Sequence, residues 1–256
     1  MALPLEQHEI LHVKGNGLFY QKEQLAVEAP LIMAVNGEET VTLRTPGHDR
    51  ALCLGFLYSE GVIGSMLDVV ALEKTASNRI EAKVTMQAPL RPRTALAACG
   101  LCGSTRLAIP ELLAHGTIED NIVVDFDLLA SLPEKMLPLQ TLFAQTGGTH
   151  AAALFDSSGQ CIALYEDIGR HNAVDKLLGF ALENHLLPFS GILCLSGRAG
   201  FELVSKAAMA KIPIVCAVSA PSSLAVELAE SFGMTLVGFL RGQRANIYCG
   251  QERIRV

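Results

Sequence analysis

Two cysteines separated by two residues are the first feature of this sequence that could do chemistry. Cys99 and Cys102 form a C-x-x-C pair within the run RPRTALAACGLCGSTR, and a glycine follows each of them. Only a thiolate is a good sulfur nucleophile, and a free cysteine is mostly protonated at neutral pH. The charged residues of this run are all arginine, which favours the thiolate if they fold nearby. The pair therefore predicts either metal binding or sulfur chemistry.

Metal binding has two forms here. A structural zinc site needs four ligands, and the chain has no second C-x-x-C, so His115 and His150 are the candidate completing ligands. A zinc deaminase needs a glutamate two residues after a histidine and a proline before the first cysteine. Ala152 and Ala98 occupy those places, so the acid–base group of a deaminase is missing.

Sulfur chemistry also has two forms. A thioredoxin-like redox pair opens a helix after a strand, and the helix-breaking Gly100 and Gly103 oppose that. In sulfur relay, one thiolate accepts a sulfane sulfur as a persulfide and passes the outer sulfur to an acceptor. The neighbouring thiol assists release by attacking the inner sulfur, which leaves a disulfide. Relay needs an exposed, mobile cysteine loop, which the glycines suit.

The composition indicates a protein with a substantial hydrophobic core. The cysteine usage indicates a reducing compartment. The chain has 256 residues, of which 50% are hydrophobic and 18% charged, enough for one large domain or two smaller ones. Seven cysteines without regular spacing argue against a secreted disulfide scaffold. The N-terminus lacks the pattern of a signal peptide, and no apolar run is long enough to span a membrane. We therefore expect a cytoplasmic protein without a membrane span.

Charge is unevenly distributed. The net charge of −6 gives no support for nucleic-acid binding. Residues 82–110 nevertheless contain no Asp or Glu, and from Phe239 onward four arginines face a single glutamate. Two basic segments on an acidic protein suggest a local anion site, and two solvated surface patches are the alternative.

The N-terminal part, residues 1–115, is predicted to be β-rich and to end in the C-x-x-C loop. Two strands in residues 25–45 flank Asn36-Gly37, a strong hairpin signal. Apolar residues at helical spacing predict a short helix that ends at Gly61, and residues 68–86 suggest two further strands. Prolines, including Pro133, are expected to break the helical patches of residues 107–145.

Residues 116–256 are predicted to form a three-layer α/β domain. Short apolar strands at 191–196, 212–218 and 234–240 alternate with amphipathic helices, which is typical of parallel crossovers. Ligands of such sheets bind beyond the carboxyl ends of the strands, here near residues 196–198, 219–223 and 239–244. The fold class is therefore α/β, or α+β when the N-terminal region is included.

Six motifs in order make the chain recognisable. They are VNGEETVTLRTPGHDRALCLGFLYSEGVI, ACGLCG, TGGTHAAAL, EDIGRHNAVDKLLG, LSGRAGFELVSKAA and GMTLVGFLRGQRANIY. Together they resemble the FdhD family, the formate dehydrogenase accessory sulfurtransferases, over roughly residues 25 to 250.

The resemblance implies a fold, a reaction and partners. It implies a small N-terminal domain and a cytidine-deaminase-like α/β domain without the zinc site, hence no metal, and it implies a homodimer. A cysteine desulfurase would load a persulfide on Cys99, with Cys102 as its partner. The sulfur would pass to the molybdenum of a bis(molybdopterin guanine dinucleotide) cofactor before that cofactor enters formate dehydrogenase. A cofactor chaperone without sulfur chemistry, or a structural metal at the C-x-x-C, is the alternative.

The resemblance also assigns a cofactor-binding segment, which consists of Phe239, Leu240, Arg241, Gly242, Gln243 and Arg244. The two arginines suit phosphate oxygens, and a guanine nucleotide is a natural mimic of the cofactor. Phe239 either stacks on guanine or belongs to the core. Arg198 is a second phosphate candidate, and Asp167 either binds guanine or pairs with Arg170.

Overall fold

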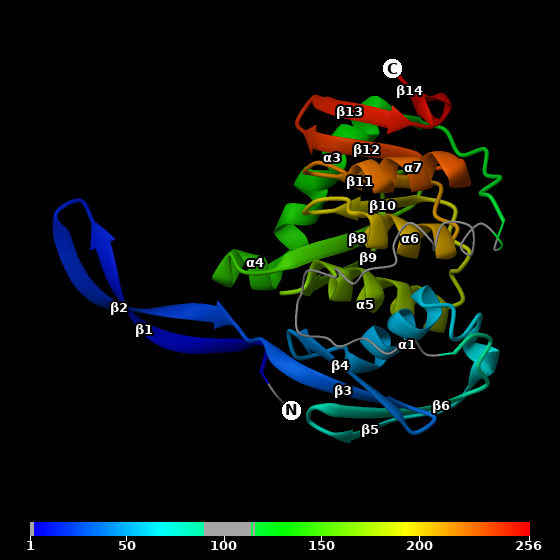
Figure 1. Ribbon diagram of the computed structural model, residues 1–256. Coiled ribbons are helices and arrows are strands. Elements are labelled where there is room, and N and C mark those ends of the chain that lie inside the picture. Colours follow the sequence, from blue (N-terminus) through cyan, green and yellow to red (C-terminus); the bar gives the residue numbers. More distant parts are fainter. Residues whose placement is uncertain (1–2, 90–113, 115) are drawn as a thin grey trace.

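The protein consists of a projecting hairpin, a small sheet and a large layered domain (Figure 1). The computed structural model describes residues 3–89, 114 and 116–256. The predicted boundary between residues 115 and 116 stays a prediction, since residues 90–113 and 115 lie outside the described chain. Among the described residues, no helix combines the length and the apolar character needed to span a membrane.

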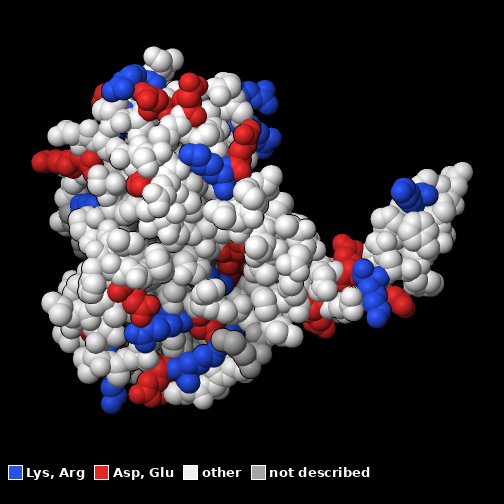
Figure 2. Space-filling model, turned by 180° about the vertical axis from the view of Figure 1, so that it is seen from behind, with Lys and Arg blue, Asp and Glu red and all other residues white. Residues whose placement is uncertain are grey.

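The hairpin is an arm that stands away from the body of the molecule (Figures 1 and 2). Its strands, β1 (Leu5–Lys14) and β2 (Gly17–Ala26), pair antiparallel along their whole length. They form a sheet of their own, and no other described strand pairs with either edge. No sequence pattern predicted this arm, because its outer half lacks the polar and apolar alternation of a half-buried strand.

The small sheet has the strand order β4-β3-β6-β5 and one helix against it. Its hairpin turn at Asn36-Gly37 and the end of its helix near Gly61 confirm the sequence predictions, since all three residues have positive φ. The elements are β3 (Ala29–Val35), β4 (Glu38–Arg44), α1 (Asp49–Ser59), η1 (Met66–Asp68), β5 (Val69–Ala76) and β6 (Arg79–Val84).

The large domain is built on a six-stranded mixed sheet with the order β13-β12-β11-β10-β8-β9. Its three central strands β10, β11 and β12 run parallel, as the alternating pattern predicts, and the outer pairings are antiparallel. The elements are β7 (Val124–Asp125), α3 (Phe126–Met136), η3 (Leu137–Leu139), α4 (Thr141–Thr146), β8 (His150–Phe155), β9 (Cys161–Asp167), α5 (Arg170–Glu183), β10 (Ile192–Leu195), α6 (Phe201–Met209), β11 (Ile214–Ala217), α7 (Ser223–Phe232), β12 (Thr235–Arg241), β13 (Arg244–Cys249), η4 (Gln251–Arg253) and β14 (Ile254–Arg255).

Helices cover both faces of this sheet, which confirms the three-layer α/β prediction. Helices α5, α6 and α7 pack on one face, and α3 packs on the other. Successive side chains of strand β8 point to opposite faces of the sheet. Ala152 and Leu154 pack in the core beneath α5, α6 and α7, whereas Ala153 and Phe155 pack in the core beneath α3. Pro133 lies inside α3 rather than breaking it, which corrects one expectation. The burial of Leu129, Leu132 and Met136 on the same helix offsets the lost hydrogen bond.

The two sheets are joined by the contact of α1 with α5 (Figure 1). At the crossing, Gly55 and Gly179 bring the backbones together, so that a methyl group on Gly179 would lie 1.8 Å from the Ala51 carbonyl oxygen. Lys206 on α6 donates to Asp175 at 2.5 Å and to Ser59 at 2.7 Å, and all three side chains are buried. The interface thus combines a backbone contact with a satisfied buried ion pair.

Gly179→Ala should destabilise the protein strongly. Alanine gains about 1 kcal/mol of helix propensity over glycine, but the clash with a backbone carbonyl forces α1 and α5 apart. We expect unfolding free energy to fall by about 3 kcal/mol or more, measured by urea denaturation. Gly200→Ala is the matched control, since nothing lies within 4 Å of its added methyl group. Equal stability of the two variants would contradict this account of the helix contact.

Candidate functional site

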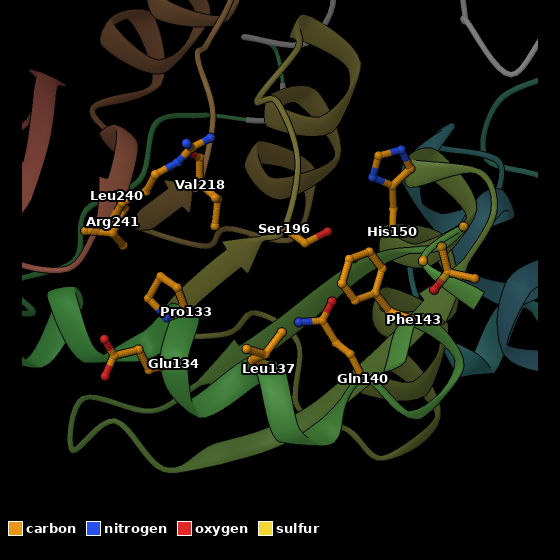
Figure 3. A pocket seen from close by; sticks show the side chains of 13 residues that line it. Pro133, Glu134, Leu137, Gln140, Phe143, His150, Ser196, Val218, Leu240 and Arg241 are labelled. Atoms are coloured by element: carbon orange, nitrogen blue, oxygen red, sulfur yellow. The ribbon is translucent and has the colours of Figure 1, made fainter. Parts of the chain in front are cut away.

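A pocket of about 560 Å³ lies where the parallel strands end (Figure 3). The chain positions just after β10 and β11 contribute Ser196 and Val218, and the end of β12 contributes Leu240 and Arg241. Strand β8 runs antiparallel to β10, so its first residue, His150, reaches the same edge. This is the edge at which the sequence predicted a ligand.

Helix α3, η3 and α4 close the other side of the pocket. They supply an apolar wall with two polar exceptions, Glu134 and Gln140, and the turn into β8 adds two glycines and a threonine. The residues of this side are Pro133, Glu134, Leu137, Gln140, Phe143, Gly147, Gly148 and Thr149. A mostly apolar cleft with a few converging polar groups is typical of a small-molecule site.

The buried carboxylate of Glu166 holds this wall in place. It accepts hydrogen bonds from the backbone N–H groups of Leu142 at 2.9 Å and Phe143 at 2.7 Å, and from the Thr149 hydroxyl at 2.9 Å. Helix α4 has only six residues and could not hold its position by propensity alone. A side chain at the end of β9 therefore fixes the orientation of the pocket wall.

The predicted segment 239–244 is a hairpin tip rather than a loop beyond the last strand. Strand β12 continues to Arg241, Gly242 turns the chain with a φ of 53°, and β13 begins at Arg244. Arg241 and Arg244 are directly opposite each other in the ladder, and both are exposed. Neither forms an ion pair with a described carboxylate, so two like charges face each other at this tip.

Within this segment the residues take different roles. The Arg241 Nε donates to the Val218 carbonyl at 3.1 Å, which fixes the guanidinium at the mouth of the pocket. Leu240 is buried and lines the pocket. Phe239 is 43% exposed in a bulge with a φ of 53°, so it is not a core residue, and it is not among the pocket-lining residues.

Asp167 has neither of the two roles that the sequence suggested, guanine binding or an ion pair with Arg170. Its carboxylate pairs with Lys176 at 2.7 Å, not with Arg170. It also accepts hydrogen bonds from the backbone N–H groups of Thr45 and Gly169. Because Asp167 is fully buried in this network, it belongs to the contact between the two sheets and not to a ligand site.

His150 is the one histidine among the described residues that line the pocket. Burial lowers the pKa of its imidazole below the usual 6.5, and the positive charges of Arg170 and Arg198 lower it further. Asp167 opposes this shift. The histidine is therefore neutral at pH 7 and adds a hydrogen-bonding ring rather than a charge.

Five of the seven cysteines lie within the described chain, and none is poised as a nucleophile. Burial raises the pKa of Cys53 and Cys194 to about 12 and that of Cys249 to about 11. It also raises the pKa of Cys161 and Cys216. Cys99 and Cys102 lie outside the described residues, as does His115. The part of the chain that is described contains no group of three or more metal-ligating side chains.

A family model described as the FdhD/NarQ family matches residues 26–255. The chain belongs to this family. A protein from Streptomyces avermitilis is 42% identical over 99% of this chain and 97% of its own length. Proteins from Nocardia farcinica and Sulfurisphaera tokodaii are each 46% identical, over 97% and 98% of this chain and 94% and 100% of their own lengths. All three are named sulfur carrier protein FdhD.

The fold is also found in a crystal structure. A Desulfotalea psychrophila protein, proposed to be a formate dehydrogenase accessory protein, superposes with a TM-score of 0.79 at 24% identity. The match covers 98% of this chain and 99% of that one, so the arrangement seen here is shared by a distant structure.

Several residues that line this pocket fall in motifs of the FdhD/NarQ family that the sequence singled out, and others do not. The motifs TGGTHAAAL and LSGRAGFELVSKAA contain His150 and Ser196, and the segment 239–244 contains Arg241. Gln140 and Phe143 were missed, because the short apolar stretch around them has no chemical signature.

The protonation of His150 can be followed by NMR. We expect its pKa in the folded protein to lie below 6.5, and to rise toward that value in Arg198→Gln because a nearby positive charge is removed. Since the unfolded chain takes up this proton first, acidification below pH 6.5 should also reduce stability. Arg244→Gln is the control and should leave the titration unchanged. A His150 pKa above 6.5 in the native protein would contradict this electrostatic picture.

Proposed function

We propose that this protein is a sulfurtransferase that carries sulfur to a molybdenum cofactor. A persulfide forms on Cys99, and its outer sulfur goes to bis(molybdopterin guanine dinucleotide) molybdenum before that cofactor enters formate dehydrogenase. Support comes from membership of the FdhD/NarQ family and from relatives named sulfur carrier protein FdhD over nearly the whole chain. The cytoplasm is the compartment that this reducing chemistry requires.

The burial of the described thiols, which is partial for Cys161, is the observation that carries this proposal. Nucleophilic sulfur chemistry needs a thiolate, and burial raises the pKa of every described cysteine. Only Cys99 and Cys102 are left for the role. Their glycine-flanked run contains arginine as its only charged residue type, which favours the anion.

The two thiols together account for the electrons of the delivery step. The Cys99 thiolate attacks the sulfane sulfur of a cysteine desulfurase persulfide, which forms a new S–S bond and releases the donor thiolate. In the delivery step, the Cys102 thiolate attacks the inner sulfur of the Cys99 persulfide, so that the Cys99–Cys102 disulfide forms as the S–S bond to the outer sulfur breaks and that sulfur passes to the acceptor at the sulfide level. The two cysteines supply the two electrons, and a cellular dithiol reduces the disulfide for the next cycle.

The pocket and the hairpin tip suit a polyanionic substrate with ring systems. Arg241 and Arg244 face each other without a described carboxylate partner, so a pyrophosphate between them would neutralise both. Of the described lining residues, Glu134 alone is acidic. The cavity of about 560 Å³ is large enough for one nucleotide-sized portion of the cofactor.

Persulfide formation on Cys99 is the decisive measurement. After incubation with a cysteine desulfurase and cysteine, we expect mass spectrometry to show a gain of roughly 32 Da, one sulfur atom, on the Cys99 peptide. Cys99→Ser should lose the adduct and formate dehydrogenase activity in cells. Cys161→Ser, which removes a half-buried thiol, is the control and should keep both.

Other outcomes separate the alternatives. Absence of an adduct with intact cofactor binding would indicate a carrier without sulfur chemistry. Stoichiometric zinc released by Cys99→Ser would indicate a structural metal site instead. Full formate dehydrogenase activity of Cys99→Ser in cells without a paralogue would overturn the proposal.

A homodimer formed through the arm is the second part of the proposal. Tyr58 offers little to a partner, because its hydroxyl donates to the Met209 carbonyl within the chain. The arm offers a better surface, because one face of its outer half exposes Leu11, Val13, Leu18 and Tyr20 by 52 to 74%. From Ile10 to Gln21 only Lys14 is charged, and this end is largely white in Figure 2.

A second copy of the chain is the partner that best fits the apolar face of the arm. A two-stranded hairpin is marginally stable alone in water, and exposed apolar patches of this kind mark interaction sites. Both strand edges are without a described partner strand, so two arms related by a twofold axis can extend one another's sheet and cover the apolar face.

Light scattering after size-exclusion chromatography tests the arm. We expect the mass of a dimer for the native protein and of a monomer for the double variant Leu11→Ser/Tyr20→Ser, which removes apolar area from the arm. Leu67→Ser/Val70→Ser changes two similarly exposed residues on the body and should remain dimeric. A dimer that survives the arm substitutions would place the interface elsewhere.

A further inference from the structure

Gln140 is a mostly buried residue whose side-chain amide faces the pocket. The residue is 6% exposed, and its side chain points into the cavity (Figure 3). Its backbone N–H donates to the Leu137 carbonyl, but no described group is hydrogen-bonded to its side-chain amide. The amide therefore keeps its hydrogen-bonding groups available to the cavity, and a ligand that pairs with both of them gains affinity.

Phe143 lies beside this amide and presents an aromatic ring to the same cavity (Figure 3). Its ring is 38% exposed, while its backbone N–H is fixed by Glu166 at 2.7 Å. The same carboxylate holds Leu142 and Thr149, so the ring stands on an anchored wall. Aromatic rings stack on flat heterocycles, and an anchored ring does so with little loss of entropy.

The geometry points to Gln140 and Phe143 as the pair that recognises a flat bicyclic heterocycle with a cyclic-amide edge, in which an N–H stands next to a C=O. The Gln140 carbonyl accepts from that N–H, and its NH₂ donates to that C=O, while Phe143 stacks on the ring. Guanine and pterin both carry this edge. The inference rests on the proposed function, since it assigns the ring-binding part of the same site.

The position of Arg241 agrees with this assignment. Arg241 lies at the mouth of the pocket, fixed by its bond to the Val218 carbonyl. A nucleotide with its ring against Phe143 can therefore place its phosphates toward the hairpin tip. Phe239, the aromatic residue that the sequence suggested for stacking, is not among the residues that line this cavity.

Gln140→Met should remove recognition of the ring edge while keeping the shape of the side chain. The probes are GDP and purine riboside 5′-diphosphate, whose ring lacks both the carbonyl and the N–H, measured by calorimetry on the full chain. We expect the native protein to prefer GDP, and Gln140→Met to bind GDP about 5- to 150-fold more weakly and to lose the preference. Phe143→Leu should weaken both nucleotides.

Matched control variants separate a loss of ring recognition from a general loss of folding or binding. Gln145→Met lies on the same helix with an exposed side chain, and Phe19→Leu alters a ring on the arm that is 43% exposed. Both should bind GDP like the native protein. Inorganic pyrophosphate should bind Gln140→Met normally and Arg241→Gln weakly. If Gln140→Met fails to fold by circular dichroism, Gln140→Asn, which retracts the amide by one methylene, takes its place with the same expectation.

The outcomes distinguish this inference from the proposed function. Native affinity of the Gln140 variant for GDP, or no preference for GDP by the native protein, overturns the inference while the persulfide test still decides sulfur transfer. Pyrophosphate binding without nucleotide binding also overturns the inference alone. Competition by 6-hydroxymethylpterin that depends on Gln140 supports it with pterin as occupant, and GDP binding that pterin does not displace supports it with guanine.

Discussion

The close approach of α1 and α5 is the constraint on which the rest of the structure depends. Gly55 and Gly179 let the two backbones touch, and any larger side chain at either place would meet a carbonyl group. This contact joins the core of the small sheet to the core of the large domain. Because packed interiors do not yield to an added methyl group, two glycines set the relation between the halves.

Buried ion pairs then fix the orientation that the glycine contact allows. Lys206 reaches Asp175 and Ser59, and Lys176 reaches Asp167 together with the Thr45 carbonyl. Each lysine is almost fully buried, so a sliding of the halves would leave a charge without a partner. Asp167 and Glu166 are neighbours on β9, yet one faces the interface between the halves and the other anchors the pocket wall. Strand alternation thus links the assembly of the molecule to the shape of its site.

Burial determines the chemical behaviour of the cysteines that the structure describes. Thiols inside the sheet, such as Cys194 and its neighbour Cys216 on the adjacent strand, act as small core residues with raised pKa values. The cores of this protein keep these thiols protonated by excluding water. The ligand pocket meanwhile contains a histidine whose pKa is lowered by burial and by the charges of Arg170 and Arg198, so its ring adds a hydrogen-bonding group rather than a positive charge near neutral pH.

The sequence by itself determined the local elements and the kind of chemistry. Its alternating strands and helices fixed the parallel centre of the large sheet, Asn36-Gly37 and Gly61 marked a turn and a helix end through positive φ, and six ordered motifs indicated the family. Tertiary structure decided what depends on distant neighbours. Only packing showed that Asp167 pairs with Lys176, that Phe239 bulges outward while Leu240 points into the pocket, and that Gln140 and Phe143 line the cavity. Local patterns report on backbone preference and burial, whereas a binding site is set by contacts between segments far apart in the chain, such as β9 holding α4.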